Sequence, residues 1–387
     1  AGDGGTPVCD TTRGMCVGCL NDNDCAGDAG AAHVCDTMAK KCVQCVLPRD
    51  CHNPNAPICD NQICRGCKVD FECMGIGPEV CMSHVGKHCA TDDETVYVKK
   101  TSCSDTMPSS GSKTLPFCNS QPAIDSANGR PPPRDGGTGA DAGPAPLKNL
   151  VVMRGTDPLT FWTFNANRTL TVVGKDGAVI HGGAFEGITL GAGTLYLRDL
   201  EVSGGDTAGI NATGGELHLD RVVAAGNRGG IFLDNTSFAI TNSVIAGGTQ
   251  AMIPNSLIVW SGIFIGTIPA AGPASLFNDT IVGNATGAVV CGDTASTPSR
   301  ARLAGLILWG NSLDFLGNCT VPASCCGLAN GQPVDPMLDS TYHLISGSPC
   351  INKLTAGNLT SYDFEGDPRP LGGASDCGAD EFRPTTP

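Results

Sequence analysis

The residues of this sequence best suited to chemistry are cysteines, which recur in a short pattern near the N-terminus. A Cys-x2-Cys-x5-Cys core occurs three times, each time after another cysteine that precedes an aspartate, and a half-repeat closes the array. The cysteines concerned are Cys9, Cys16, Cys19, Cys25, Cys35, Cys42, Cys45, Cys51, Cys59, Cys64, Cys67, Cys73, Cys81 and Cys89. Thiols at this density can hold zinc, attach haem, exchange disulfides or form a static disulfide framework.

Of these four possibilities, the spacing and composition favour the disulfide framework. Cys-x2-Cys pairs about twenty residues apart resemble zinc ribbons, but each repeat holds more cysteines than the two that a ribbon half-site needs. No Cys-x2-Cys precedes a histidine, as haem attachment requires, and thioredoxin-like chemistry uses one such motif rather than three in tandem. We therefore predict disulfides, which implies a protein that is secreted, extracellular or on a bacterial cell surface.

A second candidate for chemistry is a charged cluster formed by Arg198, Asp199, Asp220 and Arg221. If the two segments stack in register, Arg198 lies above Asp220, and Asp199 lies above Arg221. The cluster is then either a carboxylate–guanidinium site or a crossed pair of surface salt bridges, each worth at most about 1 kcal/mol. We favour the salt bridges and predict no catalytic, cofactor-binding or metal-binding residues, although the acidic net charge of −14 would admit calcium.

The segments that carry this cluster belong to a periodic region in which the sequence repeats about every 22 residues. Apolar residues at relative positions 0, +3 and +5 align as the rungs Leu197/Leu200/Val202, Leu219/Val222/Ala224, Ile240/Ser243/Ile245, Phe277/Thr280/Val282 and Leu303/Leu306/Leu308. Alternation within a rung is typical of a strand with one buried face, and the broken step indicates a bend. The pattern predicts an all-β fold, a right-handed parallel β-helix. Ile258/Ser261/Ile263 is either a compressed rung or part of a loop within 246–274.

These patterns predict two domains, namely cysteine-rich repeats of little regular secondary structure over 1–92 and the β-helix over 93–387. A strand at Thr95–Val98 and a short helix at Gln121–Ala127 are expected to cap the first coil, with a Pro/Gly-rich insertion at 129–146. Cys103 and Cys118 should pair to tie down this cap. Both domains hold an even number of cysteines, so every thiol can find a partner.

The closing segment, residues 342–382, carries the most specific motifs of the chain. They are Tyr342-His-Leu, Ser346-Gly-Ser-Pro-Cys-Ile351, Asp363-Phe-Glu-Gly-Asp-Pro-Arg-Pro370 and Asp376-Cys-Gly-Ala-Asp-Glu-Phe382. This ending resembles that of secreted bacterial β-helix proteins of the choice-of-anchor Q type, within the pectate-lyase-like superfamily. The resemblance implies a segment that completes the far end of the helix, and we expect Cys350 and Cys377 to pair within it. In that family a cell-surface anchor follows this ending, whereas the sequence stops at Pro387.

The composition narrows the function further. No basic stripe is present, which argues against nucleic-acid binding, and no apolar run is long enough to span a membrane. The resembling superfamily includes lyases and glycosidases, but the adjacent Asp pairs, Gly-His-Gly and Arg-x-Lys of polygalacturonases are missing from the helix. We therefore expect an extracellular structural or adhesive protein without catalysis, which self-associates into an oligomer or fibre or binds a matrix or surface. The alternative is a polysaccharide-active lyase or glycosidase, or a carbohydrate-binding protein that uses the helix groove.

Overall fold

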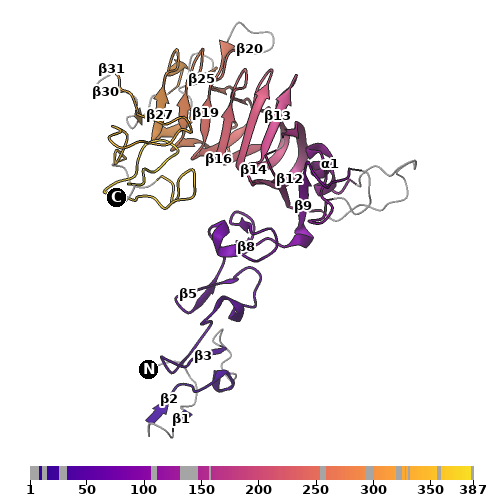
Figure 1. Cartoon of the computed structure of the whole chain (residues 1–387), viewed down its shortest axis with the longest axis vertical. Helices are drawn as coiled ribbons and strands as arrows, with labels where there is room; N and C mark the ends of the chain where they lie inside the picture. The colour runs from indigo at the N-terminus through magenta and orange to yellow at the C-terminus, as the bar shows by residue number, and fades with distance from the viewer. Residues whose placement is uncertain are drawn as a thin grey trace, which may run out of the picture. The chain divides into compact units, whose positions relative to one another are not determined.

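In a computed structural model, the chain forms two compact units, Ala1–Glu94 and Thr95–Pro387 (Figure 1). The structure describes residues 8–10, 15–25, 33–105, 111–130, 147–156, 158–252, 259–292, 300–319, 325–326, 328–329, 332–354 and 359–384. From residue 131 on, the predicted insertion at 129–146 lies outside this description, as do the side chains of Cys9, Cys16 and Cys325. None of the helices described is long and apolar enough to cross a membrane.

The first unit consists of short antiparallel hairpins joined by 3-10 turns, as predicted for a disulfide-rich region of little regular structure. The hairpins are β1 (Val8–Asp10) with β2 (Met15–Val17), β3 (Val34–Asp36) with β4 (Lys41–Val43), β5 (Ile58–Asp60) with β6 (Ile63–Arg65), and β7 (Cys81–Met82) with β8 (His88–Cys89). The turns are η1 (Asp22–Cys25), η2 (Pro48–Asp50) and η3 (Asp70–Cys73). Strands this short bury almost no apolar surface, so the hairpins need covalent support.

A repeated hydrogen bond fixes the turn of three of these hairpins. Lys40, Gln62 and Lys87 take positive φ values of 55°, 68° and 52° at equivalent places in the turns. The carbonyl of each accepts a backbone N–H from the preceding Cys-x2-Cys region, in the pairs Gly18 N to Lys40 O (3.0 Å), Gln44 N to Gln62 O (3.2 Å) and Cys67 N to Lys87 O (2.8 Å). The three turns therefore share one backbone conformation and one hydrogen bond, although the third hairpin belongs to the half-repeat.

The second unit is a parallel β-helix of about six turns over residues 150–317, which confirms the predicted fold class. Three parallel sheets run along it, and the long strands β12, β14 and β16 bend from one sheet to the next (Figure 1). Sheet 1 contains β9 (Thr95–Lys99), β10 (Leu150–Arg154), β12 (Trp162–Lys175), β14 (Ile188–Gly205), β16 (Glu216–Ala225), β18 (Ser237–Thr241), β23 (Ala274–Phe277) and β26 (Arg302–Ala304). Sheet 2 contains β11 (Leu159–Thr160), β13 (Val179–Gly183), β14, β16, β19 (Val244–Ala246), β24 (Thr280–Val282), β27 (Leu306–Trp309) and β29 (Cys325–Cys326). Sheet 3 contains β12, β14, β15 (Ile210–Ala212), β17 (Ile231–Leu233), β22 (Ile263–Ile265), β25 (Val289–Cys291) and β28 (Phe315–Gly317).

The core of the helix is built from inward-pointing residues that stack in register from coil to coil. One such stack runs through Leu197, Leu219, Ile240, Leu276 and Leu303 of sheet 1. At the N-terminal end the helix α1 (Ser120–Ala127) buries its apolar face in the same core as β9 and β10. Each fully buried aliphatic side chain of this kind stabilises the fold by roughly 1.5–3 kcal/mol.

The predicted rung Phe277/Thr280/Val282 is wrong by one residue. Ile240 pairs with Leu276, and Ile245 pairs with Ile281, so the rung is Leu276/Asp279/Ile281. In the observed register, the stack of equivalent positions that contains Asp199 and Arg221 continues through Asn242 to Asn278. Both alternatives place apolar residues at the outer rung positions. The predicted rung placed Thr280 at the middle position. In the structure that position holds Asp279, whose carboxyl group is fully buried and accepts a hydrogen bond from Ser243 N (2.9 Å).

The segment 246–274 is neither a separate rung nor a simple loop. It contains a small antiparallel hairpin, β20 (Ala251–Met252) with β21 (Val259–Trp260), followed by β22. Strand β22 pairs with β17 below it and β25 above it, so it is the third strand of the coil that β18 and β19 begin. The extra length is therefore an excursion within one coil.

The closing segment lies along the side of the helix as well as following its last coil. Leu344, Leu354 and Ala379 pack with Val282 and Ile307 on the outer face of sheet 2 (Figure 1). Backbone and side-chain bonds continue this contact, for example from Ala379 N to Thr280 Oγ1 (3.0 Å). The apolar outer positions of β19, β24 and β27 explain this placement, because the closing segment removes them from water.

The predicted pairing of Cys350 with Cys377 is wrong. Cys350 forms its disulfide with Cys326, and among the described cysteines Cys377 is free and buried. Strand β29 lies next to β27 in sheet 2, and the closing segment covers that sheet, so Cys326 and Cys350 meet with a Cα–Cα distance of 5.6 Å. Cys103 and Cys118 form a disulfide beside the cap, and Cys291 bonds Cys319 across the last coils.

Candidate functional site

The disulfides of the first unit follow one rule, in which the first cysteine of a module bonds the third and the second bonds the fourth. The pairs are Cys19–Cys35 and Cys25–Cys42 in module 1, Cys45–Cys59 and Cys51–Cys64 in module 2, and Cys67–Cys81 and Cys73–Cys89 in module 3. These modules begin at the second cysteine of each Cys-x2-Cys, so they are out of phase with the sequence repeat. Three sulfur atoms of each module lie close enough to hold a metal, but as disulfides they lack the thiolate that zinc needs.

Carboxylates fix the loop between the first two cysteines of each module. Asp24 accepts hydrogen bonds from the backbone of Leu20 (2.7 Å) and Asn21 (3.0 Å), and Asp50 accepts the equivalent bonds from Val46 (2.8 Å) and Leu47 (2.7 Å). These two backbone bonds lower the pKa of Asp50 below its usual range. The acid at this place therefore acts as a turn cap and keeps the loop in one conformation.

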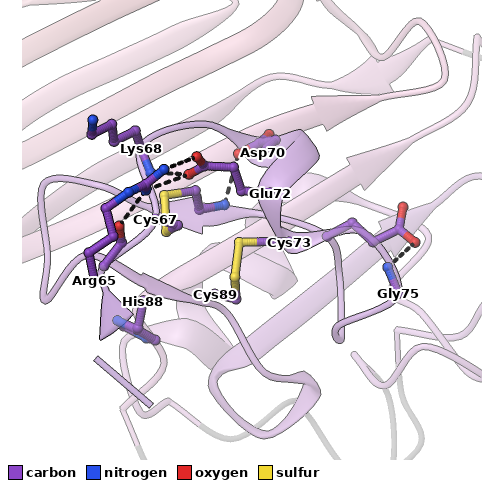
Figure 2. The surroundings of a disulfide bond; sticks show 12 residues. Arg65, Cys67, Lys68, Asp70, Glu72, Cys73, Gly75, His88 and Cys89 are labelled. Carbon is purple, nitrogen blue, oxygen red and sulfur yellow. Dashed lines mark hydrogen bonds and ion pairs between the residues drawn. A yellow bond between two sulfur atoms is a disulfide. The ribbon is translucent and has the colours of Figure 1, made fainter. Parts of the chain in front are cut away.

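Module 3 strengthens the same arrangement with an ion pair (Figure 2). Glu72 accepts from Lys68 N (2.7 Å) and from the Arg65 guanidinium (2.7 Å), while Arg65 also donates to Asp60 (2.7 Å). Burial opposes ionisation of Glu72, yet its bonds to Arg65 and the backbone hold the pKa below the usual value. A second acid, Asp70, accepts from Cys81 N (2.8 Å), so both ends of the loop are anchored.

The same loops, and the residue directly after the loop of module 3, expose large apolar side chains to water. Phe71 is 67% exposed and Met74 is 73% exposed in module 3, while Val46 and Leu47 are 47% and 44% exposed in module 2. The disulfides on either side prevent these loops from folding back to cover them. Rigid, exposed apolar groups on equivalent loops are suited to contact with a partner.

The charged cluster predicted from sequence is assembled as a ladder at the bend between sheets 1 and 2. Arg221 donates to both carboxylate oxygens of Asp199 (2.6 and 2.9 Å) and to Asp220 (2.6 Å), while Arg198 Nε lies 3.5 Å from Asp199. Asn242 of the next coil donates to the other oxygen of Asp220 (3.0 Å). Both carboxylates are therefore bound by neighbouring side chains, as in a surface ladder, and neither is held apart as a general base requires.

A second charged cluster, which the sequence analysis did not identify, lies in the closing segment. Its centre is Arg369, whose side chain pairs with Glu381 (3.1 Å) at 0% and 1% exposure. Arg369 also donates to the carbonyls of Asp376 (3.1 Å), Gly378 (2.8 Å) and Ala379 (2.6 Å). These bonds join the two motifs 363–370 and 376–382. The arginine of the first motif and the glutamate of the second therefore have a structural role, which is to hold the closing segment together.

Beside this centre, His343, Glu365 and Asp380 meet at a pocket of about 190 Å³. Their ligand atoms all lie within 4.8 Å of one another, and His343 Nε2 contacts Glu365 Oε1 directly. Burial, together with the charges of Asp363 and Asp380, raises the pKa of Glu365 to about 7. The pKa of His343 is also raised: burial alone would lower it, but the charge of Glu365 more than offsets this effect. The three residues are far apart in sequence. The only feature of the sequence that pointed to this cluster was the high number of acidic residues in the closing motifs.

Cys377 is a buried, free cysteine within the closing segment, and its burial leads to a prediction about its reactivity. Burial raises the pKa of its thiol to about 12, so almost no reactive thiolate exists at neutral pH. We expect iodoacetamide to leave Cys377 unmodified in the folded protein and to modify it after unfolding without reductant, as measured by peptide mass mapping. Modification of Cys377 at the same rate in both states would show that the thiol is accessible in the native fold.

Together these features define a disulfide-rich parallel β-helix protein with a covalently linked tandem array. Comparisons of the chain with models of protein families, with curated proteins and with solved structures found no match. Its function is therefore argued from its own geometry.

Proposed function

We propose that this chain is an extracellular structural or adhesive protein that acts by self-association through its disulfide modules, without catalysis. The observation that carries the proposal is the exposure of apolar side chains on loops that end in disulfide-bonded cysteines and carry carboxylate caps, above all Phe71, together with Met74 directly after Cys73. An apolar group that is already fixed loses little conformational entropy on binding, so such loops favour association.

Repetition strengthens this argument. Modules 2 and 3 present apolar residues from the same loop, so one chain offers more than one contact of similar chemistry. Linked weak contacts bind more tightly together than singly because later contacts form at high effective concentration. The disulfide framework suits an extracellular location, where oxidising conditions maintain it.

The β-helix supports a scaffold role. The carboxylates of its charged ladder are bound by Arg221 and Asn242, and the pectate-lyase-like resemblance by itself does not imply activity. We therefore regard the helix as a rigid body that displays or joins the modules. The alternative, a polysaccharide lyase or a carbohydrate-binding protein, would need that ladder to act on or hold a sugar.

The test is the oligomeric state of the full chain. Sedimentation velocity over a wide concentration range should show reversible association, which the double variant Phe71→Ser/Met74→Ser should reduce at least about tenfold in affinity, as for the loss of central apolar contacts. Met38→Ser is the matched control, because Met38 is 95% exposed but lies on the turn between β3 and β4, outside the loop between the first two cysteines of its module.

Two results would contradict the proposal. One is a wild-type chain that stays monomeric at every concentration, or associates equally well in the double variant. The other is release of unsaturated sugars from a polyuronate, abolished by Asp199→Asn, which would favour the lyase instead.

A further inference from the structure

We propose that His343, Glu365 and Asp380 form a binding site for a divalent transition-metal ion, with zinc as its best-fitting occupant. Imidazole and carboxylate groups are both zinc ligands, the imidazole favours a transition metal over calcium, and three protein ligands leave a position for water. The ligand atoms lie within 4.8 Å of one another beside an open pocket lined also by Leu344 and Phe382.

The histidine is oriented for metal binding by its neighbours. Asp339 Oδ1 accepts hydrogen bonds from Thr341 N (2.8 Å), Thr341 Oγ1 (2.8 Å) and His343 N (3.0 Å), which fixes the turn. Because Thr341 Oγ1 gives its hydrogen to Asp339, it accepts from Nδ1–H of His343, at 2.8 Å. This tautomer leaves the lone pair on Nε2, the nitrogen that faces Glu365. A carboxylate that orients a histidine from behind is the usual outer shell of a metal ligand.

The two carboxylates are also held in place from behind. Asp380 Oδ2 accepts from Leu344 N (2.7 Å) and so is tied to the residue after the histidine. Asp363 accepts from Glu365 N (3.0 Å) and from Glu381 N (3.1 Å), which joins the turns that carry Glu365 and Asp380. Three separate turns of the closing segment thus bring one ligand each to the same point.

The charge balance of the pocket favours a cation. Glu365 and Asp380 face each other, with Asp363 bonded to Glu365 N and Asp339 bonded to His343 N, so carboxyl groups surround the imidazole. Arg383, which lines the pocket, pairs with Asp367, and the buried Arg369 pairs with Glu381. A divalent ion at the centre would neutralise the carboxylates.

An ion at this point would also stabilise the fold, because its ligands come from all three turns. Binding to the folded chain alone raises the unfolding temperature in proportion to the logarithm of free zinc concentration above the dissociation constant. The site is independent of the proposed association through the modules, since all its residues belong to the second unit.

The experiment is a zinc titration of the chelator-treated full chain by isothermal calorimetry, with the unfolding temperature followed in parallel. We expect stoichiometric binding that weakens at acidic pH, because imidazole and carboxylate groups bind zinc in their deprotonated forms. His343→Gln and Glu365→Gln should each weaken binding by at least about tenfold and remove the thermal shift. Both positions are 36% exposed, so the variants should fold.

The control is His218→Gln. His218 also pairs with a glutamate, at 2.5 Å from Glu216, but the described residues offer no third ligand there. Its substitution should leave zinc binding unchanged. The proposal is overturned if the wild type binds no zinc, if His218→Gln weakens binding as much as His343→Gln, or if calcium binds more tightly than zinc.

Discussion

Replacing Arg369 by methionine should lower the free energy of unfolding of the β-helix unit by about 3–5 kcal/mol, the cost of breaking a buried ion pair on one side. The substitution leaves Glu381 buried without its cation, and it also removes the donors to the carbonyls of Asp376, Gly378 and Ala379. The closing segment should then detach and expose the outer face of sheet 2. Denaturation followed by tryptophan fluorescence measures this directly, because all three tryptophans lie in the second unit.

Arg383→Met is the matched control within the same segment. Arg383 pairs with Asp367, but its side chain is 66% exposed, so its loss should cost no more than about 1 kcal/mol. Equal effects of the two substitutions would show that the buried network around Arg369 does not hold the closing segment together.

Removing one disulfide from module 3, by Cys73→Ser with Cys89→Ser, should unfold that module under conditions in which the wild type is native. The bond joins residues 16 apart, and the chain-entropy model gives such a link a stabilisation of about 3 kcal/mol. The buried cluster that holds the module's cysteines has Ile58 packed against it, and Val80 and Met82 are the other fully buried apolar residues between Cys67 and Cys89, so the module has a small core. Limited proteolysis with mass spectrometry should find new cleavage between residues 67 and 89.

The control is Cys103→Ser with Cys118→Ser, which removes a bond of nearly the same span, 15 residues. Phe117, next to Cys118, and Ile124 of the following helix are fully buried in the main core of the β-helix. We therefore expect a loss of stability in the second unit without unfolding of the modules. If the module 3 variant resists protease as well as the wild type, the disulfides are not what maintains the array.

The sequence alone was sufficient to predict the β-helix because the evidence for it is local and repeated. A residue such as Leu219 contacts its equivalents one coil away in either direction, so a period of about 22 residues fixes both the strands and their stacking. The disulfide-rich character of the first unit followed from cysteine density in the same way. Neither inference required knowledge of which distant segments meet.

The sequence could not determine features that depend on contacts between segments far apart in the chain. Phe277 and Leu276 are both apolar, and the choice between them depended on burying Asp279 and on how the closing segment covers sheet 2. The partner of Cys350 depended on the place where strand β29 ends.

The cluster of His343, Glu365 and Asp380 could not be predicted from the sequence, because it too depends on contacts between distant segments. Its members are separated by 22 and 15 residues without a regular pattern, and each looks like an ordinary turn residue in its own motif. Composition and periodicity therefore determined the two kinds of architecture in this protein. Disulfide pairing, the covering of sheet 2 and the convergence of the ligands were decided only by the tertiary structure, because they depend on where non-repeating segments pack.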